Sequence, residues 1–239
     1  MKEWDISINY GIKTGFNEAF IISGDKRQEI LEACQSEDER ERTAQLMRPI
    51  LRGKDIKRYG YTFANLYVIT AFFGIHKIMK KEYPAIYSHL KMYEEKLKAR
   101  GQSRYTSSKR INTKADYPGQ HHWLELDNNP SLEYMDDFNK QKIVFSRISG
   151  NEPCFSLDNQ QYMINDTGYM ITGDNLEYLL EKLCSPIYWF AFKRFYMGGG
   201  IEKEFKVNNL ANLPIPKFGF QELELTEEEM KFISFSVNE

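Results

Sequence analysis

The sequence lacks the features that define several classes of protein. It contains no run of about 18 apolar residues, the length that a membrane-spanning helix needs, and residues 1–5 lack the apolar stretch of a signal peptide. Its three cysteines, Cys34, Cys154 and Cys184, show no spacing typical of metal ligands. We therefore expect a cytoplasmic protein with no membrane partner, in which reduced thiols serve as small hydrophobic side chains.

Little in the composition indicates disorder. Hydrophobic residues make up 41% of the 239-residue chain and charged residues 28%, which is ordinary for a globular protein. A chain of this length can form one domain with a smaller appendage. We expect a main domain at residues 1–172 and a helical and extended C-terminal part at 173–239, which packs on the main domain or on a catalytic partner.

The net charge of −2 hides an uneven distribution of charge. Residues 48–114 contain sixteen Lys or Arg against four acids, whereas residues 115–138 contain six acids and no Lys or Arg. Residues 221–239 contain six Glu against one Lys. A basic face with acidic flanks would attract nucleic-acid phosphates through counterion release, although a solvated lysine-rich helix surface would give the same pattern.

Hydrophobic periodicity predicts a mixture of helices and strands. Ile6 and Ile8, the glycines Gly11 and Gly15, and the apolar residues 20–22 predict an N-terminal hairpin. The rest of the pattern predicts a helix at 26–33, a helix capped by Ser36, an aromatic strand within 59–73, a helix at 84–101, a long polar loop at 101–119, strands at 142–148 and 161–164, helices capped by Asp174 or Asn175 and opened by Pro186, and an extended 213–216. We therefore expect an α+β fold with a small mixed sheet, long loops and C-terminal helices.

Five motifs occur in an order that resembles one known family. They are GIKTGFNEAF at 11–20, LRGKDIKRY at 51–59, KIVFS at 142–146 followed by Asn165 and Asp166, NLEYLL at 175–180, and LPIP at 213–216. Together they resemble the TaqI-like C-terminal specificity domain, the target recognition domain of type IIG restriction-modification enzymes and adenine-specific DNA methyltransferases. The last two also resemble the ending of type I specificity subunits. The resemblance implies a module that selects a double-stranded DNA site for phage defence beside a methyltransferase or nuclease domain or subunit.

The sequence also lacks the catalytic motifs of such enzymes. An adenine methyltransferase of this kind needs a glycine-rich loop for S-adenosylmethionine and an Asn-Pro-Pro-Tyr type motif that holds the flipped base. The nearest strings, Asn128-Asn129-Pro130-Ser131 and Gly198-Gly199-Gly200, have the wrong residues or the wrong context. We expect no catalytic residue, metal site or cofactor in this chain. The resemblance places S-adenosylmethionine and a divalent metal in separate catalytic domains.

Two sets of residues are candidates for DNA contact. Cations and glycine-flanked backbone amides suit phosphates, whereas Arg, Asn and Gln side chains present the hydrogen-bond pairs that read guanine and adenine. The phosphate candidates are Lys13, Thr14, Gly15, Arg52, Lys54 and Arg58. The base-reading candidates are Arg104, Lys109, Arg110, Asn112, Gln120 and Arg147.

Several of these residues have structural alternatives. Arg52 pairs with Asp55 in one interpretation and so braces the loop, and Arg147 pairs with Glu152 or Asp158. One interpretation of the aromatic residues Tyr59, Tyr61, Phe63 and Tyr67 is a platform that stacks unpaired bases, as in proteins that bind single strands. Their alternation favours packing in the core instead.

Two other functions remain open. A cryptic metal-dependent nuclease would use Glu204-Phe205-Lys206 or the pair His121 and His122, which we interpret as surface residues. A protein-interaction subunit would use the basic loop to bind an acidic partner.

The helices within 176–195 contain more Leu and aromatic residues than one amphipathic stripe requires, so we expect them to pack against a catalytic domain.

Overall fold

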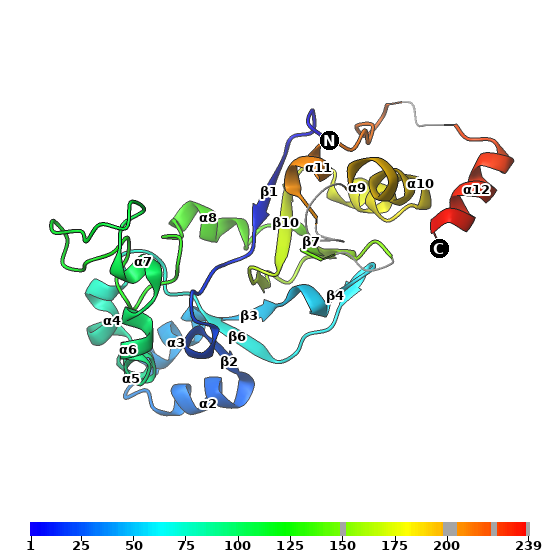
Figure 1. The fold of residues 1–239 in the computed structure, drawn as a ribbon. Helices are drawn as coiled ribbons and strands as arrows, with labels where there is room; N and C mark the ends of the chain where they lie inside the picture. The colour runs from blue at the N-terminus through cyan, green and yellow to red at the C-terminus, as the bar shows by residue number, and fades with distance from the viewer. Residues whose placement is uncertain (149–151, 198–204, 221–223, 238–239) are drawn as a thin grey trace. The chain divides into compact units, whose positions relative to one another are not determined.

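The computed structural model describes residues 1–148, 152–197, 205–220 and 224–237 (Figure 1). These residues form small open sheets and short helices, which confirms the expected α+β class. The chain divides into two compact units: unit 1 comprises Met1–Gly11, Leu51–Thr62 and Lys140–Glu239, and unit 2 comprises Ile12–Ile50 and Phe63–Asn139. Residues on both sides of position 173 lie in unit 1, whereas we expected a boundary there. Within the described ranges, no helix has the length and apolar character needed to cross a membrane.

Unit 1 is built on an antiparallel sheet with the strand order β1-β10-β7-β8. Its strands are β1 (Ile6–Tyr10), β10 (Gly168–Gly173), β7 (Lys142–Ser146) and β8 (Phe155–Asp158). Strand β1 pairs with β10 along its whole length, and Ile6 lies opposite Gly173. The predicted N-terminal hairpin is therefore wrong, because the partner of β1 comes from the far end of the chain. The strand predicted at 142–148 is confirmed as β7.

Helices cover this sheet and close the core of unit 1. They are α9 (Leu176–Leu183), α10 (Pro186–Ala191), the π-helical turn η2 (Phe192–Tyr196) and α11 (Val207–Ala211). A further helix, α12 (Glu227–Val237), packs on α10. Helix α9 packs on β7 and β8, where Phe145, Phe155 and Phe205 form a ring cluster with centroids 5.0–5.5 Å apart. The two predicted helices are confirmed, but side-chain capping is not. Asn175 adopts a left-handed backbone (φ 53°) and its side chain makes no capping hydrogen bond.

A buried ion pair joins two strands of this sheet. Lys142 of β7 lies opposite Asp158 of β8, and neither side chain is exposed. The Lys142 Nζ lies 2.5 Å from Asp158 Oδ2, and Tyr61 donates its hydroxyl to Asp158 Oδ1 at 3.1 Å. The backbone amides of Gln160 and Tyr162 also donate to this carboxylate, both at 2.9 Å. A charge at this depth is tolerated only with such partners.

The remaining elements of unit 1 are short. They are the 3-10 turn η1 (Gly53–Asp55), β4 (Ile56–Lys57), β5 (Gly60–Tyr61) and β9 (Met163–Ile164). The aromatic strand predicted within 59–73 is reduced to β5 and, in unit 2, β6 (Leu66–Ile69). Tyr59 lies between β4 and β5 with φ 58° and is 55% exposed, so its assignment to the core is wrong.

Unit 2 contains helices around three antiparallel strands, in which β6 lies between β2 and β3. Its other elements are α1 (Asn17–Phe20), β2 (Ile21–Ser23), α2 (Gly24–Glu32), α3 (Glu37–Leu46), β3 (Met47–Leu51), α4 (His76–Glu82), α5 (Pro84–Lys91), α6 (Glu94–Lys98), α7 (Gly101–Arg104) and α8 (Leu132–Asp137). The Ser36 cap is confirmed, since its Oγ accepts from Glu39 N at 3.2 Å.

The helix predicted at 84–101 is divided into two, α5 and α6. Tyr93 leaves helical geometry (φ −108°, ψ 9°), and its ring packs against Phe16 and His89. Gly101, predicted to end the helix, instead opens α7. The buried stripe survives, because Ile86, Leu90 and Leu97 all remain fully buried. The local periodicity thus predicts the buried face correctly and the helix continuity incorrectly, since tertiary packing at Tyr93 overrides it.

Candidate nucleic-acid interface

Three segments that are distant in the sequence meet at the turn 165–167 of unit 1: the basic motif at 51–59, the residue after β7, and the turn itself. Asn165 N donates to Leu51 O at 3.0 Å, and Gly53 N donates to Thr167 Oγ1 at 2.8 Å. Arg147 N donates to Thr167 O at 2.8 Å. A Cβ at Gly53 would lie 2.3 Å from Thr167 O, so this contact requires glycine. The turn therefore holds the basic loop at 51–59 against the end of β7.

Arg52 and Asp55 brace this basic loop from within. The guanidinium donates through Nε and Nη2 to the two carboxylate oxygens at 2.9 and 2.8 Å, and Arg52 N donates to Oδ2 at 2.8 Å. Burial opposes ionisation of Asp55, but the hydrogen bonds from Arg52 outweigh it and hold the pKa of Asp55 below its ordinary value. The same bonds raise the pKa of Arg52. The geometry thus matches the bracing alternative for Arg52.

The other two cations of the basic loop that we expected to contact phosphate differ in whether another residue holds their side chains. Arg58 is exposed, but its Nη2 donates to Cys184 O at the end of α9 (2.8 Å) and its guanidinium lies over the Tyr59 ring at 5.3 Å. Lys54 is exposed and makes no hydrogen bond or ion pair with another residue in the part of the chain that the structure describes. Among the three phosphate candidates of the basic loop, Lys54 is therefore the one best placed to meet an external anion.

Arg147 lies beside this loop. Its backbone and that of Gly53 both bind Thr167, and the Arg147 side chain is exposed. One partner considered for it, Asp158, is buried and pairs with Lys142. The structure thus brings a base-reading candidate next to the phosphate candidate Lys54, a proximity that nothing in the local sequence indicated.

The remaining phosphate candidates lie in unit 2 at the segment 13–15. Lys13 is exposed, but Thr14 is 3% exposed and its hydroxyl donates to Asn17 Oδ1 at 2.6 Å. Gly15 has φ +69°, and a Cβ there would lie 2.4 Å from the Asp127 carboxylate. Gly15 thus permits close approach of the Asp127 carboxylate. The expectation that the Thr14 hydroxyl faces a phosphate does not fit the burial of Thr14.

The base-reading candidates of unit 2 lie around the segment 105–118, which has no helix or strand. Arg104, Lys109 and Arg110 are exposed, and the Arg104 guanidinium lies over the Tyr105 ring at 5.1 Å. Asn112 Oδ1 accepts from Lys114 N at 3.0 Å, so its amide is partly engaged. Two turns shape the segment: Thr106 N donates to Arg110 O at 2.8 Å, and Asn112 N donates to Pro118 O at 2.5 Å. We call residues 105–118 the polar loop; it is the green excursion near α7 in Figure 1.

The base of the polar loop is fixed to the body of unit 2. Gln120 N donates to Gln102 O at 2.7 Å, and the Gln102 side chain exchanges two 2.7 Å hydrogen bonds with Asn128. A Cβ at Gly119 would lie 2.1 Å from Gln102 O, so only glycine fits there. Gln120 is half-buried, and its carbonyl accepts from Asn129 Nδ2 at 3.0 Å. The exposed cations are thereby carried on an anchored loop.

Arg100, which we counted with the basic surface, is instead buried beneath this loop. Its Nη1 donates to Thr14 O at 2.6 Å and Asp127 Oδ1 at 3.1 Å, and its Nη2 donates to the carbonyls of Trp123 and Glu125 at 2.9 and 2.7 Å. Burial lowers the pKa of Arg100 to about 10, against the opposing effect of Asp127 and Glu125. Five directed donors suit this role, which a lysine could not fill.

The histidine pair is not the surface pair that we expected. His121 is fully buried, and its Nε2 lies 3.0 Å from Asp127 Oδ1. The His122 ring stacks on His76 with centroids 4.6 Å apart, and the Tyr117 ring packs edge-on against His76 at 5.3 Å. Burial, followed by the neighbouring His76, lowers the pKa of His122 to about 4. These residues support the end of the polar loop. The sequence did not indicate the burial of His122, because the ring that stacks on it, His76, comes from α4.

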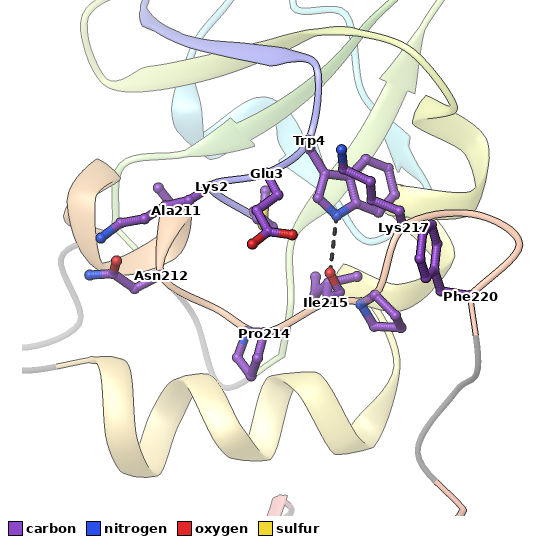
Figure 2. Close-up of a pocket in the computed structure, with 11 residues that line it drawn as sticks. Lys2, Glu3, Trp4, Ala211, Asn212, Pro214, Ile215, Lys217 and Phe220 are labelled. Atoms are coloured by element: carbon purple, nitrogen blue, oxygen red, sulfur yellow. Dashed lines mark hydrogen bonds between the residues drawn. The ribbon is translucent and has the colours of Figure 1, made fainter.

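The other chemical candidates give no catalytic arrangement among the residues that the structure describes. Glu204 of the nuclease triplet lies outside the described residues, as does the cluster Gly198-Gly199-Gly200. No group of three or more His, Cys, Asp or Glu that could hold a metal occurs within the ranges that the structure describes. Unit 1 has a half-open cavity of about 560 Å³, shown in Figure 2, where Trp4 Nε1 donates to Ile215 O at 3.0 Å. Prolines, Phe220 and a few charged residues line this cavity, which suits packing better than catalysis.

Comparison with known proteins points to one family. The family model described as the TaqI-like C-terminal specificity domain matches residues 48–215. Comparison with curated proteins gives no match. Among solved structures, the chain is similar to the type IIL restriction-modification enzyme MmeI in complex with DNA, with a TM-score of 0.51 and 13% identity over 97% of this chain. At that identity the likeness concerns the fold alone, and the match spans 27% of the MmeI chain.

Proposed function

Because the chain belongs to the TaqI-like C-terminal specificity domain family, we propose that it recognises a specific double-stranded DNA sequence for a restriction-modification enzyme. The observation that carries this proposal is the extent of the family match, residues 48–215, which includes both the basic loop and the polar loop. Each of these loops exposes cations on a braced backbone. DNA recognition requires exposed cations on a fixed backbone, because a hydrogen-bond donor that is out of position cannot pair with a base edge.

The two loops suit different kinds of contact. Lys54, beside the exposed Arg147, would neutralise phosphates and fix the register on the duplex. Arg104 and Arg110 would reach base edges, where a guanidinium forms two hydrogen bonds with guanine O6 and N7. The Tyr105 ring under Arg104 supports this role, because stacking holds a guanidinium plane in one orientation. Gln120 and the remaining donor of Asn112 are candidates for adenine.

The enzymatic context is part of the same proposal. The chain would act beside a methyltransferase and nuclease of type IIG character, which would supply S-adenosylmethionine chemistry at adenine and metal-dependent cleavage. The likeness to an enzyme chain of which this fold spans 27% supports that context. This chain would contribute site selection and no catalytic group.

The test is selection of bound duplexes from a randomised DNA pool at low salt by the purified chain. The selected duplex is then titrated with salt against a scrambled duplex of the same composition. Enrichment of one short motif, with tighter binding than to the scrambled duplex at every salt concentration, is the expected result. Equal affinity for every duplex would contradict sequence recognition by this chain, and absence of binding would favour a protein-interaction subunit.

A further inference from the structure

Helix α12 and the turn η2 leave three phenylalanines uncovered in unit 1. Phe195, Phe232 and Phe235 are 75%, 62% and 69% exposed, whereas Ile233 and Ser236 of the same helix are buried. We call these three residues the aromatic ridge. Contiguous exposed apolar surface of this kind marks an interaction site more often than a solvent face.

The aromatic ridge is formed by two packed segments of the chain. Helix α12 packs on α10 (Figure 1), and the ring of Phe190 in α10 lies 6.0 Å from that of Phe232 and 6.3 Å from that of Phe195. Phe190 thus joins Phe195 of η2 to Phe232 of α12. The surface is therefore assembled from two segments of the chain and depends on their packing.

Opposite charges lie near the two ends of α12, the acidic one on α12 itself and the basic one on η2. Glu227 and Glu228 are exposed in its first turn, whereas Glu229 is engaged with Thr226 in a capping box. A hollow of about 320 Å³ is lined by Phe190, Lys193, Arg194 and Ser236 and so brings two cations beside the C-terminal end of α12. The surface formed by α12 and η2 therefore runs from acidic, through aromatic, to basic.

We propose that this surface is the interface with a second copy of the chain, in which two α12 helices pack antiparallel. A two-fold contact places the same patch against itself, so each acidic end would meet the basic end of the other copy. The aromatic ridges would meet between them, removing their exposed rings from water. A patch of one charge would repel its own copy; this one is self-complementary.

The consequence goes beyond the proposed function. Two copies joined through unit 1 would carry two sets of DNA-contacting loops in one particle. Binding of one copy to DNA would then raise the local concentration of the second set near the same duplex. DNA recognition by a single copy does not depend on this interface, so the two proposals succeed or fail separately.

The test is the mass of the full chain in solution, measured by light scattering or sedimentation from about 1 to 100 μM. We expect a mass that rises with concentration from 28.2 kDa towards twice that value. The double variant Phe232→Ser/Phe235→Ser should weaken association at least tenfold with an unchanged circular dichroism spectrum. Phe73→Ser, which alters an exposed phenylalanine in unit 2, should associate like the wild type. A wild type that stays at 28.2 kDa overturns the proposal and points to a different protein domain as the occupant.

Charge exchange tests the antiparallel arrangement itself. Glu227→Lys/Glu228→Lys makes both ends basic, and Lys193→Glu/Arg194→Glu makes both ends acidic. Each variant alone should lose association, and an equimolar mixture should recover it as a mixed dimer. Variants that associate as well alone as together would overturn the arrangement. DNA selection by the same variants reports separately on the proposed function.

Discussion

The guanidinium of Arg100 donates to the backbone carbonyl of Thr14 at 2.6 Å, across 86 residues of sequence. A threonine that we expected to face DNA is thus held inward by an arginine that we counted as surface charge. The same guanidinium binds the segment 123–127, so one side chain joins the start of unit 2 to the segment after the polar loop. Support of the polar loop therefore depends on a buried cation.

Replacement of Arg100 should destabilise unit 2 strongly. Arg100→Met removes the guanidinium donors from four backbone carbonyls and from Asp127, which retains its contact with His121. Breaking a buried pair in this way costs about 3–5 kcal/mol. Urea denaturation would measure the loss. The control Lys98→Met removes an exposed pair with Glu94, for which the expected cost is below about 1 kcal/mol. Equal losses in the two variants would contradict the central role of Arg100.

The base of the polar loop should not tolerate a Cβ at position 119. Gly119→Ala would place that atom 2.1 Å from Gln102 O and must displace the loop. We expect the preference for the selected DNA over a scrambled duplex to fall at least tenfold, while affinity for scrambled DNA changes little. Fluorescence anisotropy would measure both affinities. Gly101→Ala is the matched control, because a Cβ at Gly101 meets nothing within 4 Å.

Lys54 and Arg110 should affect DNA binding in different ways. Lys54→Ala should weaken binding to all sequences and reduce the slope of log affinity against log salt by about 1. Arg110→Ala should cost about 1–3 kcal/mol at one base position and relax the preference there. Lys80→Ala, an exposed lysine of α4, is the control for a general charge effect. If all three variants bind like the wild type, the assigned contacts are incorrect.

Asp158 should matter more to stability than Lys142. Asp158→Ala removes the acceptor of four donors, among them a buried ammonium, whereas Lys142→Met leaves the carboxylate with Tyr61 and two backbone amides. We expect a loss of about 3–5 kcal/mol for Asp158→Ala and a smaller one for Lys142→Met. Chemical denaturation would rank the variants, and the reverse order would show that the ammonium is the more important group.

The folded protein should lose stability as the pH falls below about 6.5. His122 has a folded-state pKa of about 4, so below the ordinary value near 6.5 the unfolded chain binds the proton preferentially. The loss should accumulate between pH 6.5 and 4 and be absent above this window. Denaturation midpoints at pH 7.5 and 5 would show it. His122→Asn, which retains a side-chain acceptor for Leu124 N, should reduce the difference between the two midpoints.

Local signals in the sequence predicted local structure well. Ser36 caps α3 because its hydroxyl reaches an amide three residues away, and the amphipathic pattern at 176–183 needs only its own residues to define a buried face. Strand pairing could not be predicted in this way. The alternation of Ile6 and Ile8 says that β1 is a strand, but nothing near it says that Gly173 lies opposite.

In the candidate interface, too, local contacts could be predicted from the sequence and long-range contacts could not. The Arg52–Asp55 pair spans three residues and was foreseen as one alternative. Thr14, in contrast, is buried where the distant Arg100 binds its carbonyl, and His121 is buried by its place in the fold. The proximity of Arg147 to the basic loop needs the turn at Thr167. Residue types therefore predicted the chemistry, and the fold decided which side chains are available for it.

The path of the chain has a consequence for protein engineering. Unit 2 consists of two separate segments, Ile12–Ile50 and Phe63–Asn139, and unit 1 supplies the residues between them. The two segments share buried contacts, such as those from His89 to Ala19 O and from Ala85 N to Glu39. A chimera that exchanges only the segment with the polar loop would break these contacts. Transplanting its specificity into a relative therefore requires both segments to be grafted as a pair.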